Sequence, residues 1–122
     1  MTDRWMVLLW GDEGFWASAT PEIQERIMNE HQAYSDACAE RGYTILGGEE
    51  LGFSKKAVTV RSDGGGTLAV TDGPYVELAE HLGGYYIVET DDVQGLARLT
   101  GELLLTDGGG AELRPVIVHG ES

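Results

Sequence analysis

Hydrophobic residues fall in short blocks along the chain, separated by polar and glycine-rich segments. Residues 4–10 are apolar and aromatic and end at a Gly-Asp-Glu-Gly segment, so they predict a buried first strand. Gly47-Gly48 indicates a β-bulge or a close backbone approach within a second strand. Pro115 indicates that the last strand lies at an edge or a bulge, because proline cannot donate to a ladder. The segments with strand composition after the first are residues 43–51, 84–89 and 112–118.

Two segments show the periodicity of amphipathic helices. The first begins at Thr20, which suits an N-cap, continues with Pro21 at the first helical position and ends before Gly42. The second begins after Thr90-Asp91-Asp92 and ends in residues 106–110. Helical spacing puts one apolar face on each helix: Ile23, Ile27, His31, Tyr34 and Cys38 on the first, and Val93, Leu96, Ala97 and Leu103 on the second.

A hairpin interrupts this series of strands and helices. The alternating segments 57–61 and 67–71 flank a Ser-Asp-Gly-Gly-Gly turn, and residues 75–82 after them have mixed signals of a helical turn or a loop. Apart from the inserted hairpin, the element order is the βαββαβ order of a ferredoxin-like α+β fold, an antiparallel sheet with two helices on one face. We expect a single domain over residues 1–122.

The second face of such a sheet has no helix to cover it. The predicted strands are rich in Trp, Val, Ile and Tyr, and two long helices can shield only one side. A large uncovered apolar face is typical of an interaction surface, and most homo-oligomers are two-fold symmetric. The sequence therefore predicts a homodimer that forms through the sheet face.

Composition narrows the functional classes. The 122 residues include 8 Lys and Arg against 21 Asp and Glu, a formal charge of −13, so we expect neither nucleic acid nor an anionic membrane surface as a partner. The first apolar block is too short for a signal peptide or a membrane span, and the single cysteine, Cys38, cannot form an internal disulfide. A cytoplasmic location fits these features. No metal-ligand spacing and no phosphate-binding loop is present in the sequence, so we expect no metal and no cofactor.

One segment carries a specific motif. Residues 70–75 read Val-Thr-Asp-Gly-Pro-Tyr, and an acidic stretch and Gly83-Gly84-Tyr85-Tyr86 follow them. In this order the elements resemble the DGPF-type members of the YCII-related family. Further matching segments are residues 8–13, 47–51, 91–92 and 112–116. The resemblance implies a ferredoxin-like subunit that dimerises into an α+β barrel, within a superfamily that includes small-molecule isomerases, lyases, a dehydrochlorinase and monooxygenases.

The resemblance also implies a His-Asp pair with its histidine on the first helix. His31 matches that histidine, since it stands eleven residues before Gly42. The family's aspartate belongs to an Asp-Pro-aromatic element after the second helix, which this chain lacks, so Asp72 is the substitute. His31 is then a general base or a core histidine bonded to a neighbour. Asp72 is its acid or orienting partner, or a residue that only stabilises its own turn.

Four further residues are candidates for binding a small-molecule ligand: Tyr34, Glu49, Tyr75 and Arg114. The two tyrosines, together with the Trp residues, would exclude water from a pocket between the first helix and the sheet. Glu49 and Glu50 are neighbours on a strand and point to opposite faces, so only one of them enters a pocket. Arg114 would hold a substrate carboxylate through two hydrogen bonds, or it neutralises acidic neighbours.

Two functional hypotheses from different classes follow. The first is a cofactor-independent enzyme of proton transfer, isomerisation or elimination, with His31 as base and Asp72 as its partner. The second is a non-catalytic ligand-binding or regulatory module. Genes of the DGPF type often lie beside those of extracytoplasmic-function sigma factors, and the acidic surface would steer the chain toward a basic partner. Superfamily analogy favours the first hypothesis.

Overall fold

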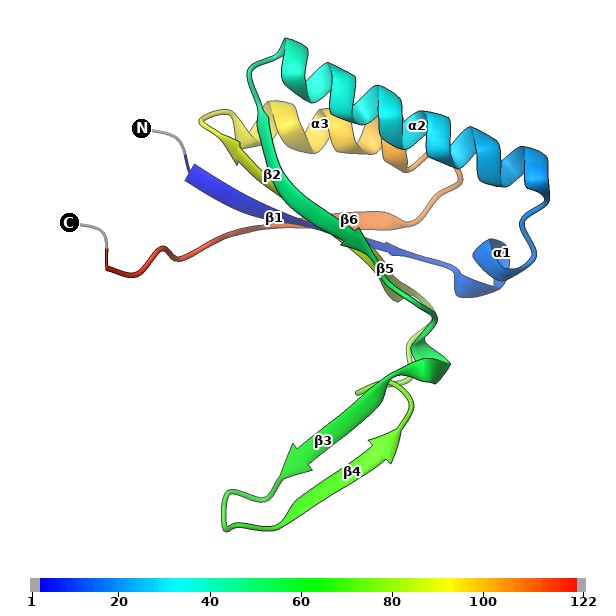
Figure 1. The fold of residues 1–122 in the computed structure, drawn as a ribbon, viewed down its shortest axis with the longest axis vertical. Helices are drawn as coiled ribbons and strands as arrows, with labels where there is room; N and C mark the ends of the chain where they lie inside the picture. The colour runs from blue at the N-terminus through cyan, green and yellow to red at the C-terminus, as the bar shows by residue number, and fades with distance from the viewer. Residues whose placement is uncertain (1–2, 121–122) are drawn as a thin grey trace.

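The computed structural model of the chain describes residues 3–120 and forms an α+β fold with a separate hairpin (Figure 1). The strands and helices, with a 3₁₀ turn η1, are β1 (Asp3–Gly11), α1 (Glu13–Ala17), α2 (Pro21–Glu40), β2 (Thr44–Glu50), η1 (Ser54–Lys56), β3 (Val58–Ser62), β4 (Leu68–Asp72), β5 (His81–Thr90), α3 (Val93–Leu104) and β6 (Gly110–Pro115).

The main sheet has the strand order β2-β5-β1-β6 with every neighbouring pair antiparallel. Helices α2 and α3 lie together on one face of this sheet (Figure 1). This order and this helix placement confirm the ferredoxin-like prediction, and β3 and β4 form the inserted hairpin. The four-stranded sheet of one chain is open, so a single chain forms no closed barrel.

The core lies between the two long helices and the sheet. It contains the sheet residues Val7 and Val88, which are fully buried. Helix α2 begins as predicted, with the Thr20 side chain accepting from the backbone N–H of Ile23. The buried apolar residues that the helices contribute are Tyr34, Cys38, Leu96 and Leu99. Tyr34, Cys38 and Leu96 belong to the predicted apolar faces, whereas Ala97, predicted on the second face, is exposed and Leu99 is buried in its place.

Three elements differ from the sequence prediction. Helix α1 lies in a segment for which the sequence predicts no helix; the Asp12 side chain stabilises its start by accepting from the N–H of Gly14 as an N-cap. Strand β5 begins at His81, earlier than expected, because pairing with β1 continues past a register shift. Strand β6 ends at Pro115, short of the predicted Val118, and it lies at the sheet edge as the proline indicated.

The glycine pair of β2 lies at an irregularity, as predicted. The register of β2 against β5 shifts between Ile45 and Gly47. A Cβ atom at Gly48 would lie 2.5 Å from the backbone oxygen of Tyr85, so this position requires glycine. The pair therefore combines a bulge with a close backbone approach.

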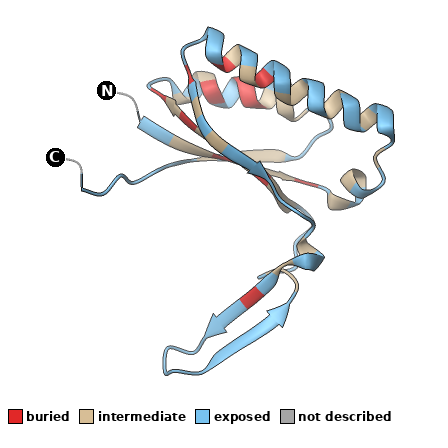
Figure 2. Cartoon of the chain, in the orientation of Figure 1, coloured by how far each residue is buried: buried red, intermediate tan, exposed pale blue. Residues whose placement is uncertain are grey.

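The hairpin and the second sheet face are left without a covering layer. The β3–β4 hairpin projects away from the sheet, and its surface is almost entirely exposed (Figures 1 and 2). Its apolar residues Val58, Val60, Leu68 and Val70 are between 57% and 68% exposed. In residues 3–120, no helix is long and apolar enough to cross a membrane.

Candidate functional site

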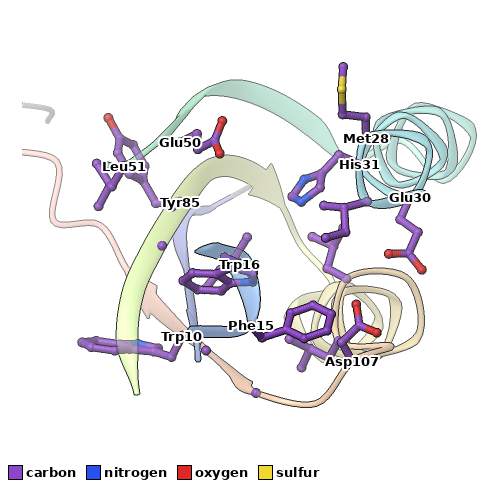
Figure 3. Close-up of a pocket in the computed structure, with 18 of the residues that line it drawn as sticks. Trp10, Phe15, Trp16, Met28, Glu30, His31, Glu50, Leu51, Tyr85 and Asp107 are labelled. Carbon is purple, nitrogen blue, oxygen red and sulfur yellow. The ribbon is translucent and has the colours of Figure 1, made fainter. Parts of the chain in front are cut away.

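A cavity of about 830 Å³ lies between α2, α1 and the ends of the central strands (Figure 3). Helix α2 contributes Ile27 and His31 to its wall, and α1 contributes Phe15 and Trp16. The end of β2, the start of β5 and the loop between α3 and β6 complete the lining. The cavity is therefore a concave and largely apolar space into which a few polar groups converge, which is typical of a small-molecule site.

The Trp16 ring packs where two glycines, Gly11 and Gly83, have no side chain. A Cβ atom at Gly11 or Gly83 would lie 2.6 or 2.5 Å from the Trp16 indole ring. The ring thus packs directly on the backbone of β1 and β5 and closes one end of the cavity (Figure 3). From the sequence, the tryptophans are predicted only as a group to exclude water from the pocket, and neither Phe15 nor Trp16 is singled out as a site residue. The signal that could have found them is the N-cap Asp12 followed by two aromatic residues.

We expect Gly83→Ala to destabilise the protein by about 1–3 kcal/mol, because the added methyl group overpacks the space that Trp16 fills. The matched control is Gly101→Ala in α3, where the new methyl group meets no atom within 4 Å. Alanine there should stabilise the helix by about 0.5–1 kcal/mol. Urea unfolding monitored by tryptophan fluorescence measures both changes. Equal effects of the two substitutions would contradict the packing role of Gly83.

Glu13 fixes α1 to the segment that follows β2. Its carboxylate accepts from the backbone N–H of Ser54 at 2.7 Å and from the Ser54 hydroxyl at 2.6 Å. The hydroxyl bond above all holds the pKa of Glu13 below its usual value. The Nδ1 atom of His81 lies 3.6 Å from the same carboxylate. These contacts hold α1, which forms one wall of the cavity, in place against the chain that follows β2.

His31 lies on the cavity wall, half-buried, with its ring directed toward the sheet (Figure 3). Its Nδ1 atom is 2.6 Å from the hydroxyl of Tyr86, and the two ring centroids are 5.8 Å apart. Burial lowers the pKa of His31 below 6.5, and the carboxylates of Glu30 and Glu50 oppose that shift. The imidazole is therefore mostly neutral at pH 7, the state in which a ring nitrogen can accept a proton.

Tyr86 is the hydrogen-bond partner of His31, and the sequence analysis did not single it out. It lies on β5 with its side chain on the helix side of the sheet, since it alternates with the buried Val88. Burial raises the pKa of Tyr86, so its hydroxyl stays protonated at neutral pH. The Gly-Gly-Tyr-Tyr segment and its alternation were the signal that could have placed it beside the helix.

Tyr34 lies beneath this pair and outside the cavity lining. It is fully buried, and its ring centroid is 5.2 Å from that of Tyr86. Its hydroxyl lies 2.9 Å from the Thr100 hydroxyl, which donates to the backbone oxygen of Leu96. Tyr34 therefore supports Tyr86 through packing, and within one chain it is not exposed to a ligand in the cavity.

Asp72 and Tyr75 lie at the base of the hairpin, and neither lines the cavity of its own chain. Asp72 is exposed at the end of β4, paired with Val58. Tyr75 is 63% exposed, and the guanidinium of Arg61 lies 4.0 Å from its ring centroid. The structure of one chain therefore does not bring Asp72 to His31.

The last two candidates, Glu49 and Arg114, both lie on strands at the edges of the sheet. Glu49 and Glu50 both contribute to the cavity lining, and Glu50 is opposite Gly84 on the helix side, whereas Glu49 is opposite Tyr85. Arg114 is exposed on β6, opposite Met6, with its Nε atom 3.7 Å from the carboxylate of Glu112. Because Leu113 packs on the core, Arg114 points to the other face, away from the cavity. Because it points to the helix side of the sheet, Glu50 rather than Glu49 faces the same side as His31.

In the part of the chain that the structure describes, no group of three or more His, Cys, Asp or Glu side chains is arranged to hold a metal ion. The polar side chains that line the cavity include His31, Tyr86 and several carboxylates.

An antiparallel sheet in the order β2-β5-β1-β6 with both long helices on one face defines the chain as a ferredoxin-like α+β protein. Comparison with family models gives the more specific assignment. The model of the YCII-related domain matches residues 4–118, so the chain belongs to the YCII-related family, whose known fold is that of the dimeric α+β barrel superfamily. No curated protein matches the sequence.

Proposed function

We propose that this protein is a cofactor-independent enzyme that moves a proton on a small-molecule substrate, in an isomerisation or an elimination. One observation carries the proposal: a half-buried histidine with a lowered pKa lies on the wall of an 830 Å³ cavity beside an aromatic wall. A general base needs a pKa near the working pH and a position within reach of the substrate. The lowered pKa of His31 and its place on the cavity wall support this role.

The role of base assigns a tautomer to His31. The Nδ1–H donates to the Tyr86 oxygen, and the lone pair of Nε2 is then free to accept a proton from a substrate carbon. In an isomerisation the same nitrogen returns that proton to a different carbon. In an elimination the electron pair of the broken C–H bond forms a double bond, and a leaving group departs. The carboxylates of Glu30 and Glu50 stabilise the imidazolium that forms between the two steps.

The experiment is a screen for exchange of carbon-bound hydrogen in D₂O, followed by proton NMR over a panel of small carbon acids. We expect His31→Ala and the near-isosteric His31→Asn to lower the exchange rate by about 100-fold or more, since general-base catalysis contributes that much. His119→Ala removes an exposed histidine outside the cavity lining and is the matched control. Circular dichroism verifies that each variant is folded.

The pH dependence has a defined direction. The neutral form of His31 is the active one, so kcat/KM falls as the pH drops through its pKa, which burial lowers from the usual histidine value. The acid limb of the profile should therefore lie at a lower pH than the titration of an ordinary histidine. Unchanged exchange in both His31 variants would refute the assignment of the base, and ligand binding without any exchange in the natural protein would leave the non-catalytic module as the better description.

We also infer that two copies associate through the sheet face opposite the helices. Leu8 and Ile87 alternate with the core residues Val7 and Val88, so they point to the uncovered side. An aliphatic sheet surface of this kind loses contact with water when a second copy covers it. The family assignment supports this proposal, since the superfamily fold is dimeric.

A further inference from the structure

We propose that the ligand of the His31 cavity is an organic cation, an ammonium group on an apolar body, and not a carboxylate or a phosphate. The inference deepens the proposed function, because it names the substrate class for the same cavity. The site itself is defined by the cavity, its aromatic wall and His31; the charges of the lining select what enters it.

The charged side chains of the lining are all acidic. It contains no Lys or Arg side chain among the described residues, and the neutral His31 adds no positive charge. Arg114, which the sequence offered as a clamp for a substrate carboxylate, points to the other face of the sheet. The carboxylate side chains of the lining are Asp12, Glu30, Glu49, Glu50, Glu80 and Asp107.

Several of these carboxylates are already engaged. The Arg26 guanidinium donates to Glu30 and, through two bonds of 2.9 and 3.0 Å, to Asp107. Asp12 accepts from the first turn of α1. Within residues 3–120, no protein group donates a hydrogen bond to Glu50, and the charge of its carboxylate raises the pKa of His31, against the larger effect of burial. Glu50 therefore has acceptor positions free beside the base.

The apolar part of the lining suits a cation as well. Phe15 and Trp16 present aromatic rings to the same space as the Glu50 carboxylate and the His31 ring (Figure 3). An ammonium group gains from the negative face of an aromatic ring and from a nearby carboxylate at the same time. An anion would enter a partly desolvated space in which no lining side chain is a cation and the adjacent Arg26 is already bonded to Glu30 and Asp107, which is unfavourable. The formal charge of −13 also attracts cations and repels anions at longer range.

The test compares three probes of similar size and different charge: benzylammonium, benzyl alcohol and benzoate. Tryptophan fluorescence reports binding, since Trp16 lines the cavity. We expect benzylammonium to bind about tenfold more tightly than benzyl alcohol, and benzoate to bind most weakly. Glu50→Gln should reduce the benzylammonium affinity by about tenfold and leave that of benzyl alcohol unchanged.

Glu25→Gln is the matched control, because it removes the same charge from an exposed position of α2 outside the lining. Benzoate binding as tightly as benzylammonium, or equal losses in the Glu25 and Glu50 variants, would overturn the proposal. Its failure is distinct from that of the proposed function. Selective cation binding without hydrogen exchange would refute the catalytic role alone, whereas exchange on anionic or neutral carbon acids alone would refute the cation preference.

Discussion

Ile87→Glu should convert a dimer of about twice 13.2 kDa into a monomer. Ile87 pairs with Met6 across β5 and β1 and points away from the helices, toward the face that we propose a second copy covers. In a two-fold interface each substitution occurs twice, and the two new carboxylates would be desolvated without a partner. We expect the dissociation constant to rise by at least 100-fold, which corresponds to a loss of about 3 kcal/mol.

Light scattering at micromolar concentration measures this mass directly. Gln94→Glu adds the same charge on the exposed surface of α3 and should leave the dimer intact. A natural protein that is monomeric under these conditions would disprove the interface. A dimeric Ile87→Glu variant would show that the copies associate elsewhere, and the exposed apolar hairpin of β3 and β4 would then be the next surface to change.

Thr100→Val should destabilise the folded chain by about 1–3 kcal/mol. Thr100 donates its only hydroxyl hydrogen to the backbone oxygen of Leu96, so the Tyr34 hydroxyl is the donor in the 2.9 Å bond between the two side chains. Valine has the same shape as threonine but cannot accept, and it leaves a fully buried hydroxyl without a partner. The cost is that of desolvating a polar group that gains no bond in return.

A double-mutant cycle separates this pair from general packing. Tyr34→Phe alone should cost less, about 0.5–1.5 kcal/mol, because Thr100 keeps its bond to Leu96. The double variant should be more stable than the sum of the two single effects predicts, since no orphan hydroxyl remains. Thr44→Val, an exposed strand threonine, is the control and should change stability by less than about 0.5 kcal/mol. Urea unfolding at one fixed protein concentration measures all four; strict additivity would contradict the coupling.

Local patterns in the sequence determined most of the fold. Three signals act over only a few residues: the N-cap Thr20, the alternation of strand residues and the glycine-rich turns. They predicted α2, the hairpin and the order of the elements along the chain without tertiary information. Helical spacing likewise placed His31 toward the sheet, because side chains three or four positions apart share one face. Helix α1 was missed because one short turn has too few residues to show a period.

What lies beside His31 was decided only by the tertiary structure. Its partner Tyr86 is 55 positions away in the chain, and Glu50 reaches the same cavity from another strand. The pairing of β5 with β2 and the packing of α2 on that sheet set these positions, and neither leaves a signal in local periodicity. The sequence suggested Asp72 because its motif is distinctive, yet the hairpin carries it to the exposed end of β4. A motif fixes the conformation of its own turn, whereas strand register and helix packing determine which side chains meet.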